Sequence, residues 1–361
     1  MARVDYGTMA YAITSVTQRH LTAVALSVSL ISATLLSADR TDEFVAAQMK
    51  QFDLPGLSLA VRQGGSVSKT ATYGFADVAS KVPTTEGAVY KIGSVSKQFL
   101  ATVIMLLVQD GRVQLDAPLS TYLPDSPDAW RPITIRHLLA HTAGLVRESP
   151  GFDPMKSQSD GAIIAAAYGT PLLFTPGTKW AYSNLGYYVL AEVITKVSGR
   201  PWTQVAADRV FRPAGMAQTL PTSIQPLPPS RVIGYSGRNN QEVAPEWVAL
   251  RPSGAFLSRI DDLLKWDVAL DGDLVLSRAS REQMWTPVKL ADGTTAPYGF
   301  GWHVETWNGR RVVWHGGGLP GFTSYFARFL DQPLTVIVLA NGDDADLPAI
   351  GRGVASLYVS P

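Results

Sequence analysis

The tetrapeptide Ser-Val-Ser-Lys occurs twice in the chain, at residues 66–69 and 94–97, and each copy places a serine three residues before a lysine. A serine hydroxyl becomes a nucleophile when a nearby base takes its proton, and lysine can be that base where burial disfavours its charged form. The two copies are therefore two candidate catalytic pairs. The tetrapeptide alone does not distinguish them, because so short a pattern also arises by chance.

The elements expected around the first copy argue against it. Residues 56–62 and 66–73 have the pattern of two strands, and the two glycines between them favour a hairpin turn. Side chains at positions i and i+3 of a strand point to opposite faces of the sheet. Ser66 and Lys69 are therefore not expected to share a site.

The second copy precedes residues 97–109, which are almost wholly apolar and predict a buried central helix. Side chains at i and i+3 of a helix lie on one face, so Ser94 should face Lys97. Backbone N–H groups at a helix start would also stabilise negative charge that develops near Ser94. The alternative is a serine that only caps the helix, followed by a lysine that extends to the surface.

The remaining elements give a fold class. Strand-like segments near both ends and helical segments between them predict an α/β fold of the α+β type: one antiparallel sheet built from both chain ends, flanked by helices, with an all-helical insertion. The predicted strands near the C-terminus are residues 299–306, 311–314, 323–329 and 334–340, with an Asn-Gly hairpin signal at 308–309, and the predicted helices are residues 41–51, 133–141, 185–197, 261–270 and 347–359. We expect a sheet domain from residues 39–115 and 253–361, a helical domain from 116–252, and a cleft between them.

Composition excludes several other functions. The formal net charge of +1 removes the basic footprint of a nucleic-acid-binding protein. The absence of cysteine excludes thiol nucleophiles, thiolate metal sites and disulfides. His137 and His141 are spaced like metal ligands on a helix, but no glutamate follows the first of them, so we expect no metal and no cofactor. His141 is expected to bond the turn at residues 142–144, and His303 to be structural.

The N-terminal region has the features of an export signal. Residues 21–38 carry no charge, are rich in Ala, Val and Leu, and follow Arg19 and His20. This pattern predicts a secretory signal over residues 1–38 and a periplasmic or secreted protein. A stretch of this length could also remain as a membrane anchor, which would be the one expected contact with a membrane.

Two further motifs follow the second tetrapeptide in a defined order: Tyr182-Ser183-Asn184 directly before a predicted helix, and His315-Gly316-Gly317-Gly318 between two predicted strands. Together with the second tetrapeptide they resemble the serine β-lactamase and penicillin-binding-protein superfamily, in particular its branch of class C β-lactamases, DD-carboxypeptidases, D-aminopeptidases and β-lactamase-like esterases. Supporting stretches lie at residues 90–94, 133–145, 252–255, 298–302 and 321–322, so the resemblance extends from about residue 42 to the C-terminus.

This resemblance implies a role for each matching residue. Ser94 would form an acyl-enzyme, Lys97 would help to activate it, and Tyr182 would act as general base and then protonate the leaving group. Asn184 would hold Lys97 and the substrate. The oxyanion would bind the backbone N–H groups of Ser94 and Gly318, with Gly317 in the same strand and His315 in the place of the lysine of the third motif.

The sequence departs from the Lys-Thr-Gly form of the third motif. A mostly neutral imidazole at His315 is a poorer carboxylate anchor than a permanent cation, which favours an ester, an amide or a D-residue peptide as the substrate. A true β-lactamase or DD-carboxypeptidase, and a penicillin-binding sensor that acylates without turnover, remain the alternatives. In each case the expected partner is a small molecule or a peptide.

Overall fold

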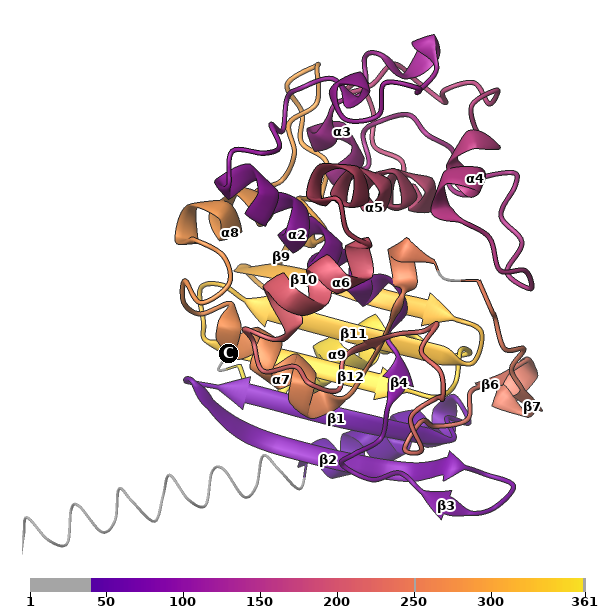
Figure 1. Ribbon diagram of the computed structural model, residues 1–361. Helices are drawn as coiled ribbons and strands as arrows, with labels where there is room; N and C mark the ends of the chain where they lie inside the picture. The colour runs from indigo at the N-terminus through magenta and orange to yellow at the C-terminus, as the bar shows by residue number, and fades with distance from the viewer. Residues whose placement is uncertain (1–39, 250, 360–361) are drawn as a thin grey trace, which may run out of the picture.

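A computed structural model describes residues 40–249 and 251–359 of the chain, and its main feature is a seven-stranded sheet. The strand order is β3-β2-β1-β12-β11-β10-β9, and neighbouring strands are antiparallel. The strands are β1 (Gly56–Gln63), β2 (Ser66–Asp77), β3 (Val82–Pro83), β9 (His303–Trp307), β10 (Arg310–Leu319), β11 (Phe322–Phe329) and β12 (Leu334–Ala340). The sheet therefore joins the two ends of the described chain, which confirms the predicted fold class (Figure 1).

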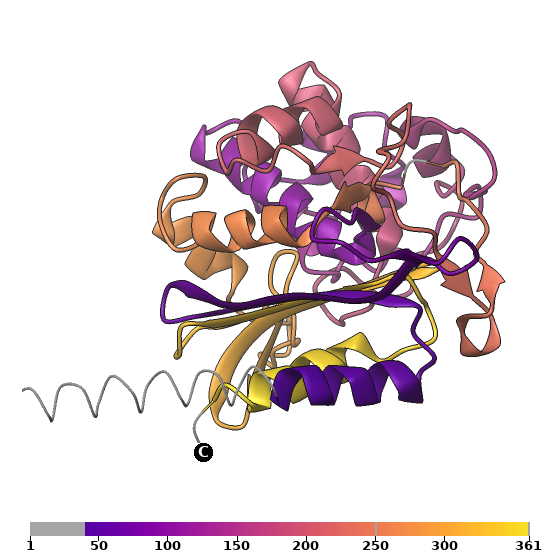
Figure 2. The same ribbon diagram turned by 90° about the horizontal axis from the view of Figure 1, so that it is seen from below.

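Side chains along β1 point alternately to the two faces of the sheet, and each face packs against a different hydrophobic core. Leu57, Leu59 and Val61 pack on the face covered by helix α9 (Leu347–Ser356) and by the helix that includes residues 40–51. Figure 2 shows these two helices side by side beneath the sheet. Ala60 points to the opposite face and belongs to the core that the remaining helices form.

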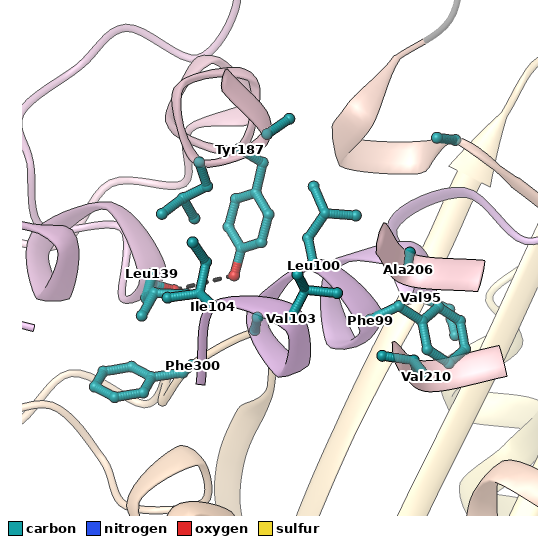
Figure 3. Close-up of a cluster of buried hydrophobic side chains, with 14 of the residues drawn as sticks. Val95, Phe99, Leu100, Val103, Ile104, Leu139, Tyr187, Ala206, Val210 and Phe300 are labelled. Carbon is teal, nitrogen blue, oxygen red and sulfur yellow. Dashed lines mark hydrogen bonds between the residues drawn. The ribbon is translucent and has the colours of Figure 1, made fainter. Parts of the chain in front are cut away.

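Helix α2 (Lys97–Gln109) is the centre of that second core, as its continuous apolar sequence predicts. Phe99, Leu100 and Ile104 are fully buried. Tyr187 from a neighbouring helix lies beside Leu100 and Ile104 and donates a hydrogen bond to the Leu139 carbonyl at 3.1 Å (Figure 3). This helix carries Lys97 at its first position, so the packing of α2 fixes the position of the lysine.

Helices between the two sets of strands lie above the sheet (Figure 1). They are α3 (Ile135–Leu139), α4 (Asp160–Ala165), α5 (Asn184–Ser198) and α6 (Trp202–Ala206), and α7 (Ile260–Ala269) and α8 (Arg278–Met284) follow later in the chain. Short strands pair in two small sheets, which are β4 (Tyr90–Lys91), β8 (Phe256–Ser258) and β5 (Leu220–Pro221), and β6 (Tyr235–Ser236) with β7 (Glu242–Val243). Gly199 follows the last residue of α5 in the left-handed conformation, with φ of 73°, and ends the helix as a glycine cap.

Two strand predictions were inaccurate. The strand predicted to begin at residue 299 begins at His303, because Gly301 has a φ of 78° that interrupts extended backbone. The glycine motif predicted between two strands lies inside β10, where residues 315–318 pair with residues 323–326 of β11. The insertion is not all-helical as predicted, because the short strands β5, β6 and β7 lie within residues 116–252. The boundaries of the sheet domain and of the insertion stay predictions.

The predicted N-terminal signal or anchor, residues 1–38, lies outside the described residues. Among residues 40–249 and 251–359, no helix is long and apolar enough to cross a membrane.

Candidate active site

Ser94 lies in a 3₁₀ turn, η1 (Gly93–Ser96), that leads directly into α2. Helix α2 begins at Lys97, as predicted, so Ser94 lies in the turn before the helix and not in the helix itself. The turn still places the two side chains together: the Lys97 Nζ donates a hydrogen bond to the Ser94 Oγ at 3.1 Å. Ser66 and Lys69 of the other tetrapeptide lie in β2, and Lys69 forms an ion pair with Asp42.

Lys97 is fully buried, and its amine contacts three oxygen atoms. Besides Ser94, it donates to the Asn184 Oδ1 and to the Ser253 carbonyl, each at 2.8 Å. Burial lowers the pKa of Lys97 well below its usual value, and the positive charges of Arg251 and Arg147 lower it further, against the opposing effect of Glu148. A lysine in this environment can release its proton and then accept one from Ser94.

Tyr182 is held beside Lys97 by the start of α5. Ser183 is the N-cap of that helix, and its hydroxyl accepts a hydrogen bond from the Gly186 N–H at 3.1 Å. The Tyr182 ring centroid lies 4.7 Å from the Lys97 Nζ. Burial raises the pKa of Tyr182 above its usual value, while a hydrogen bond with Ser94 and the charge of Arg147 act to lower it. Tyr182 is therefore a neutral phenol that can pass on a proton.

His141 supports Tyr182, contrary to the prediction that it bonds the turn at residues 142–144. Its Nδ1 accepts a hydrogen bond from the Ser183 N–H at 3.1 Å, and its ring packs 4.3 Å from the Tyr182 ring. Burial lowers the pKa of His141 well below its usual value, so the ring is neutral. The prediction failed because the residue that His141 contacts is 42 positions away in the sequence.

Strand β10 packs against the turn that carries Ser94. Within β10, Gly317 has no room for a side chain. On the neighbouring strand β11, the Ser324 hydroxyl donates a hydrogen bond to the Ile92 carbonyl at 2.7 Å. A Cβ atom on Gly317 would lie 2.1 Å from the Ile92 oxygen, and one on Gly93 would lie 2.8 Å from the Gly318 nitrogen. Glycine at these positions lets the backbone of residues 93–94 approach that of Gly318, as an oxyanion hole formed by the N–H groups of Ser94 and Gly318 requires.

Gly317→Ala should destabilise the protein by about 1–3 kcal/mol, because the added methyl group pushes β10 away from the turn. Urea unfolding followed by circular dichroism measures the change. The control for stability is Gly318→Ala, since a Cβ atom there meets nothing within 4 Å among the described residues. Equal unfolding free energies for the two variants would contradict this account of the packing.

His315 lies in β10 and is buried. Its Nε2 and the Tyr298 hydroxyl are 2.9 Å apart, and its Nδ1 is 2.6 Å from the Gly316 carbonyl. Burial lowers the pKa of His315 well below its usual value, and the nearby His303 and Lys97 lower it further. The imidazole is therefore neutral at pH 7 and provides no fixed charge. His303 stacks on Trp314 with ring centroids 4.4 Å apart.

A cavity of about 570 Å³ opens onto Ser94, and Tyr182, Asn184, His315, Gly317 and Gly318 also line it. The structure thus brings the predicted site residues together, with Lys97 buried beneath them. Our sequence interpretation did not identify the roles of the Ser253 carbonyl, of His141 or of Glu148, which accepts a hydrogen bond from Asn184. For His141, the one available indication in the sequence was the position of Tyr182 directly before a predicted helix, whose start needs a supporting contact. The contacts of Ser253 and Glu148 join residues far apart in the sequence, and no local pattern indicates them.

A larger cavity of about 810 Å³ lies elsewhere, between α7, α8 and the ends of β1, β11 and β12. Two of its arginines, Arg62 and Arg328, each pair with both Asp267 and Asp271, which ties α7 to the sheet. These arginines have a structural explanation, and Ser94 is not among the residues that line this cavity. No group of three or more potential metal ligands occurs in the described part of the chain.

Comparison with known proteins identifies the family of this chain. The family model named Beta-lactamase matches residues 41–358. The chain belongs to the Beta-lactamase family. This family of β-lactamase-like serine hydrolases includes the branch suggested by the three motifs.

Relatives of this β-lactamase-family chain include peptidases and penicillin-binding proteins. A penicillin-binding protein of Bacillus subtilis (strain 168) is 31% identical over 305 residues, which cover 78% of this chain and 67% of that protein. A D-aminopeptidase of Gluconobacter oxydans (strain 621H) is 27% identical, over 84% of this chain and 58% of that protein. The chain therefore spans less than two thirds of the length of that D-aminopeptidase.

Solved structures agree with this fold. The octameric penicillin-binding protein homologue from Pyrococcus abyssi superimposes with a TM-score of 0.78 at 24% identity, over 89% of this chain and 77% of that one. A D-stereospecific amidohydrolase from Streptomyces superimposes with a TM-score of 0.71 at 27% identity, over 82% of this chain and 92% of that one.

Proposed function

We propose that this chain is a serine hydrolase that forms an acyl-enzyme on Ser94 and cleaves an ester, an amide or a D-residue peptide bond. The observation that carries the proposal is the 3.1 Å contact between the Ser94 hydroxyl and the buried Lys97 amine at the floor of an open cavity. A nucleophile within hydrogen-bond reach of a base with a lowered pKa is the arrangement that covalent catalysis requires.

Acylation begins when the Ser94 Oγ attacks the carbonyl carbon of the substrate and its proton moves to the Lys97 amine, directly or through Tyr182. The N–H groups of Ser94 and Gly318 hold the oxyanion of the tetrahedral intermediate. The bond to the leaving group then breaks, and the Tyr182 phenol donates the proton that the leaving nitrogen or oxygen needs. Lys97 returns a proton to Tyr182.

Deacylation repeats these steps with water in place of the serine. Water attacks the acyl carbon, its proton moves to the Lys97–Tyr182 pair, and the ester bond to Ser94 breaks as Ser94 regains a proton. Asn184 positions the Lys97 amine in both halves of the cycle, since its Oδ1 accepts from Lys97 and its Nδ2 donates to Glu148. His315, as a neutral group bonded to Tyr298, supports the β10 wall and does not compete for protons.

A substrate panel with intact-mass analysis tests the proposal. We expect hydrolysis of short-chain p-nitrophenyl esters, D-aminoacyl amides or D-alanyl-D-alanine peptides, and a transient mass increase that peptide mapping assigns to Ser94. Nitrocefin and a penicillin complete the panel. A penicillin adduct that persists for hours without turnover of any other compound would instead identify a penicillin-binding sensor, and no turnover and no adduct would refute the hydrolase.

A further inference from the structure

The cavity over Ser94 has an unequal distribution of charge. None of the described residues that line it is aspartate or glutamate, whereas two arginines, Arg147 and Arg251, lie on its wall. Arg147 lies in the loop after α3, and Arg251 lies directly before η6 (Pro252–Gly254). The charge on this wall therefore depends on whether each arginine is already neutralised within the protein.

Arg251 is neutralised. It forms an ion pair with Glu148, and its guanidinium lies 5.2 Å from the ring centroid of Phe152 and 5.5 Å from that of Trp247. Glu148 in turn accepts the hydrogen bond from Asn184. Arg251 and Glu148 are thus used to hold Asn184, and through it the Lys97 amine, in place.

Arg147 forms no ion pair with any of the residues from 40 to 249 and from 251 to 359. Arg147 is exposed, and its guanidinium carbon lies 5.2 Å from the centroid of the Tyr182 ring. Its backbone is fixed, because the Arg147 carbonyl accepts hydrogen bonds from the Asn184 N–H at 2.8 Å and from the Leu185 N–H at 3.2 Å. The start of α5 therefore holds this charge beside the catalytic tyrosine.

The opposite wall, on β10, offers no competing charge. His315 is neutral, and the residues after it in the motif are glycines. Lys97 lies buried beneath the cavity floor, bonded to Ser94, Asn184 and Ser253. Among the described residues that line the cavity, Arg147 is the one cation without an anionic partner.

We propose that Arg147 selects substrates that carry a carboxylate close to the scissile bond and disfavours substrates with a free α-ammonium group. This inference rests on the proposed function and narrows its substrate class. A guanidinium pairs with a carboxylate through two parallel hydrogen bonds, and the aromatic face of Tyr182 reduces its hydration on one side. The cation that would bind the substrate carboxylate therefore lies on the α5 side of the cavity, and the wall on β10 holds the uncharged His315.

Two matched substrate series test this selectivity. The first consists of succinyl-D-alanine, acetyl-D-alanine and D-alanine p-nitroanilides, which place a negative, a neutral and a positive group at the same end. The second compares acetyl-D-alanyl-D-alanine with its C-terminal amide. We expect kcat/KM to favour the anionic member about tenfold or more in at least one series, mainly through KM.

Arg147→Gln should bring that ratio close to one, and Arg147→Glu should shift the preference toward the cationic member. The ratio within a series is the correct readout, because the charge of Arg147 also affects the pKa of Tyr182 and can therefore change the turnover of all members of a series. The matched control is Arg131→Gln, which removes an arginine that is 73% exposed and lies outside the cavity lining. This control should keep the wild-type ratio.

The outcomes separate this inference from the proposed function. Turnover of the neutral acetyl substrate with no charge preference, or a preference that Arg147→Gln leaves unchanged, would overturn the role of Arg147 and leave the serine hydrolase intact. A preference for the free D-alanine anilide would also overturn it. No turnover of any member, with Ser94 unmodified by mass, would refute both.

Discussion

Replacement of Ser94 by alanine should reduce turnover of every substrate in the panel by about 10⁴-fold or more, because no acyl-enzyme can form without the Oγ atom. The loss should appear in kcat, and the mass adduct should disappear. The fold should be unchanged, since Ser94 is not fully buried and its hydroxyl accepts a hydrogen bond from Lys97, which keeps its bonds to Asn184 and Ser253. Rates with a p-nitrophenyl ester and intact-mass spectra measure the effect.

The chain provides a matched control for this variant. Ser66 begins an identical tetrapeptide in β2 and is not among the residues that line the cavity, so Ser66→Ala should retain the wild-type rate and adduct. Thermal unfolding of both variants separates catalysis from folding. Wild-type turnover by Ser94→Ala, or an equal loss in Ser66→Ala, would show that the nucleophile is another residue.

Interactions that depend on nearby residues were predictable from the sequence. The pairing of Ser94 with Lys97 needs only a helical turn between residues three apart, and the hairpin of β9 and β10 needs only Asn308 and Gly309, which adopt φ values of 48° and 75°. The buried helix α2 follows from its continuous apolar run. In each case the local sequence restricts the backbone enough to determine the contact.

The features that were wrongly predicted, or not predicted at all, depend on contacts between residues that are distant in the sequence. The run of glycines at 316–318 has low intrinsic preference for strand, yet it lies in β10 because pairing with β11 stabilises it. The ion pair of Glu148 with Arg251 joins residues 103 positions apart, and no periodicity encodes such a partner. The charge of Arg147 was visible in the sequence, but its lack of an anionic partner becomes apparent only once these other pairs are known.

The contacts around Lys97 also suggest how the site divides its work. Lys97 has a lowered pKa and touches Ser94 directly, whereas Tyr182 has a raised pKa and faces the cavity. Groups whose pKa values are moved apart by their surroundings commonly take the roles of base and acid. This division favours Lys97 as the acceptor of the serine proton and Tyr182 as the donor to the leaving group.

Tyr182→Phe should therefore lose activity to different extents with different leaving groups. An anilide or a peptide needs a proton on its leaving nitrogen, so we expect a loss on the order of 10² to 10⁴-fold in kcat for acetyl-D-alanine p-nitroanilide. A p-nitrophenolate leaves readily without protonation, so the loss with a p-nitrophenyl ester should be smaller when acylation is measured under single-turnover conditions. Stopped-flow acylation rates for the two substrates provide the comparison.

Tyr188, which lies on α5, supplies the control for this comparison. Tyr188 is buried and lies outside the cavity lining, so Tyr188→Phe should keep both acylation rates and their ratio. An equal loss with the ester and the anilide in Tyr182→Phe would assign the phenol to activation of Ser94 and not to leaving-group protonation. Unchanged rates with both would remove Tyr182 from the chemistry, and Lys97, already bonded to Ser94, would then have to carry every proton transfer by itself.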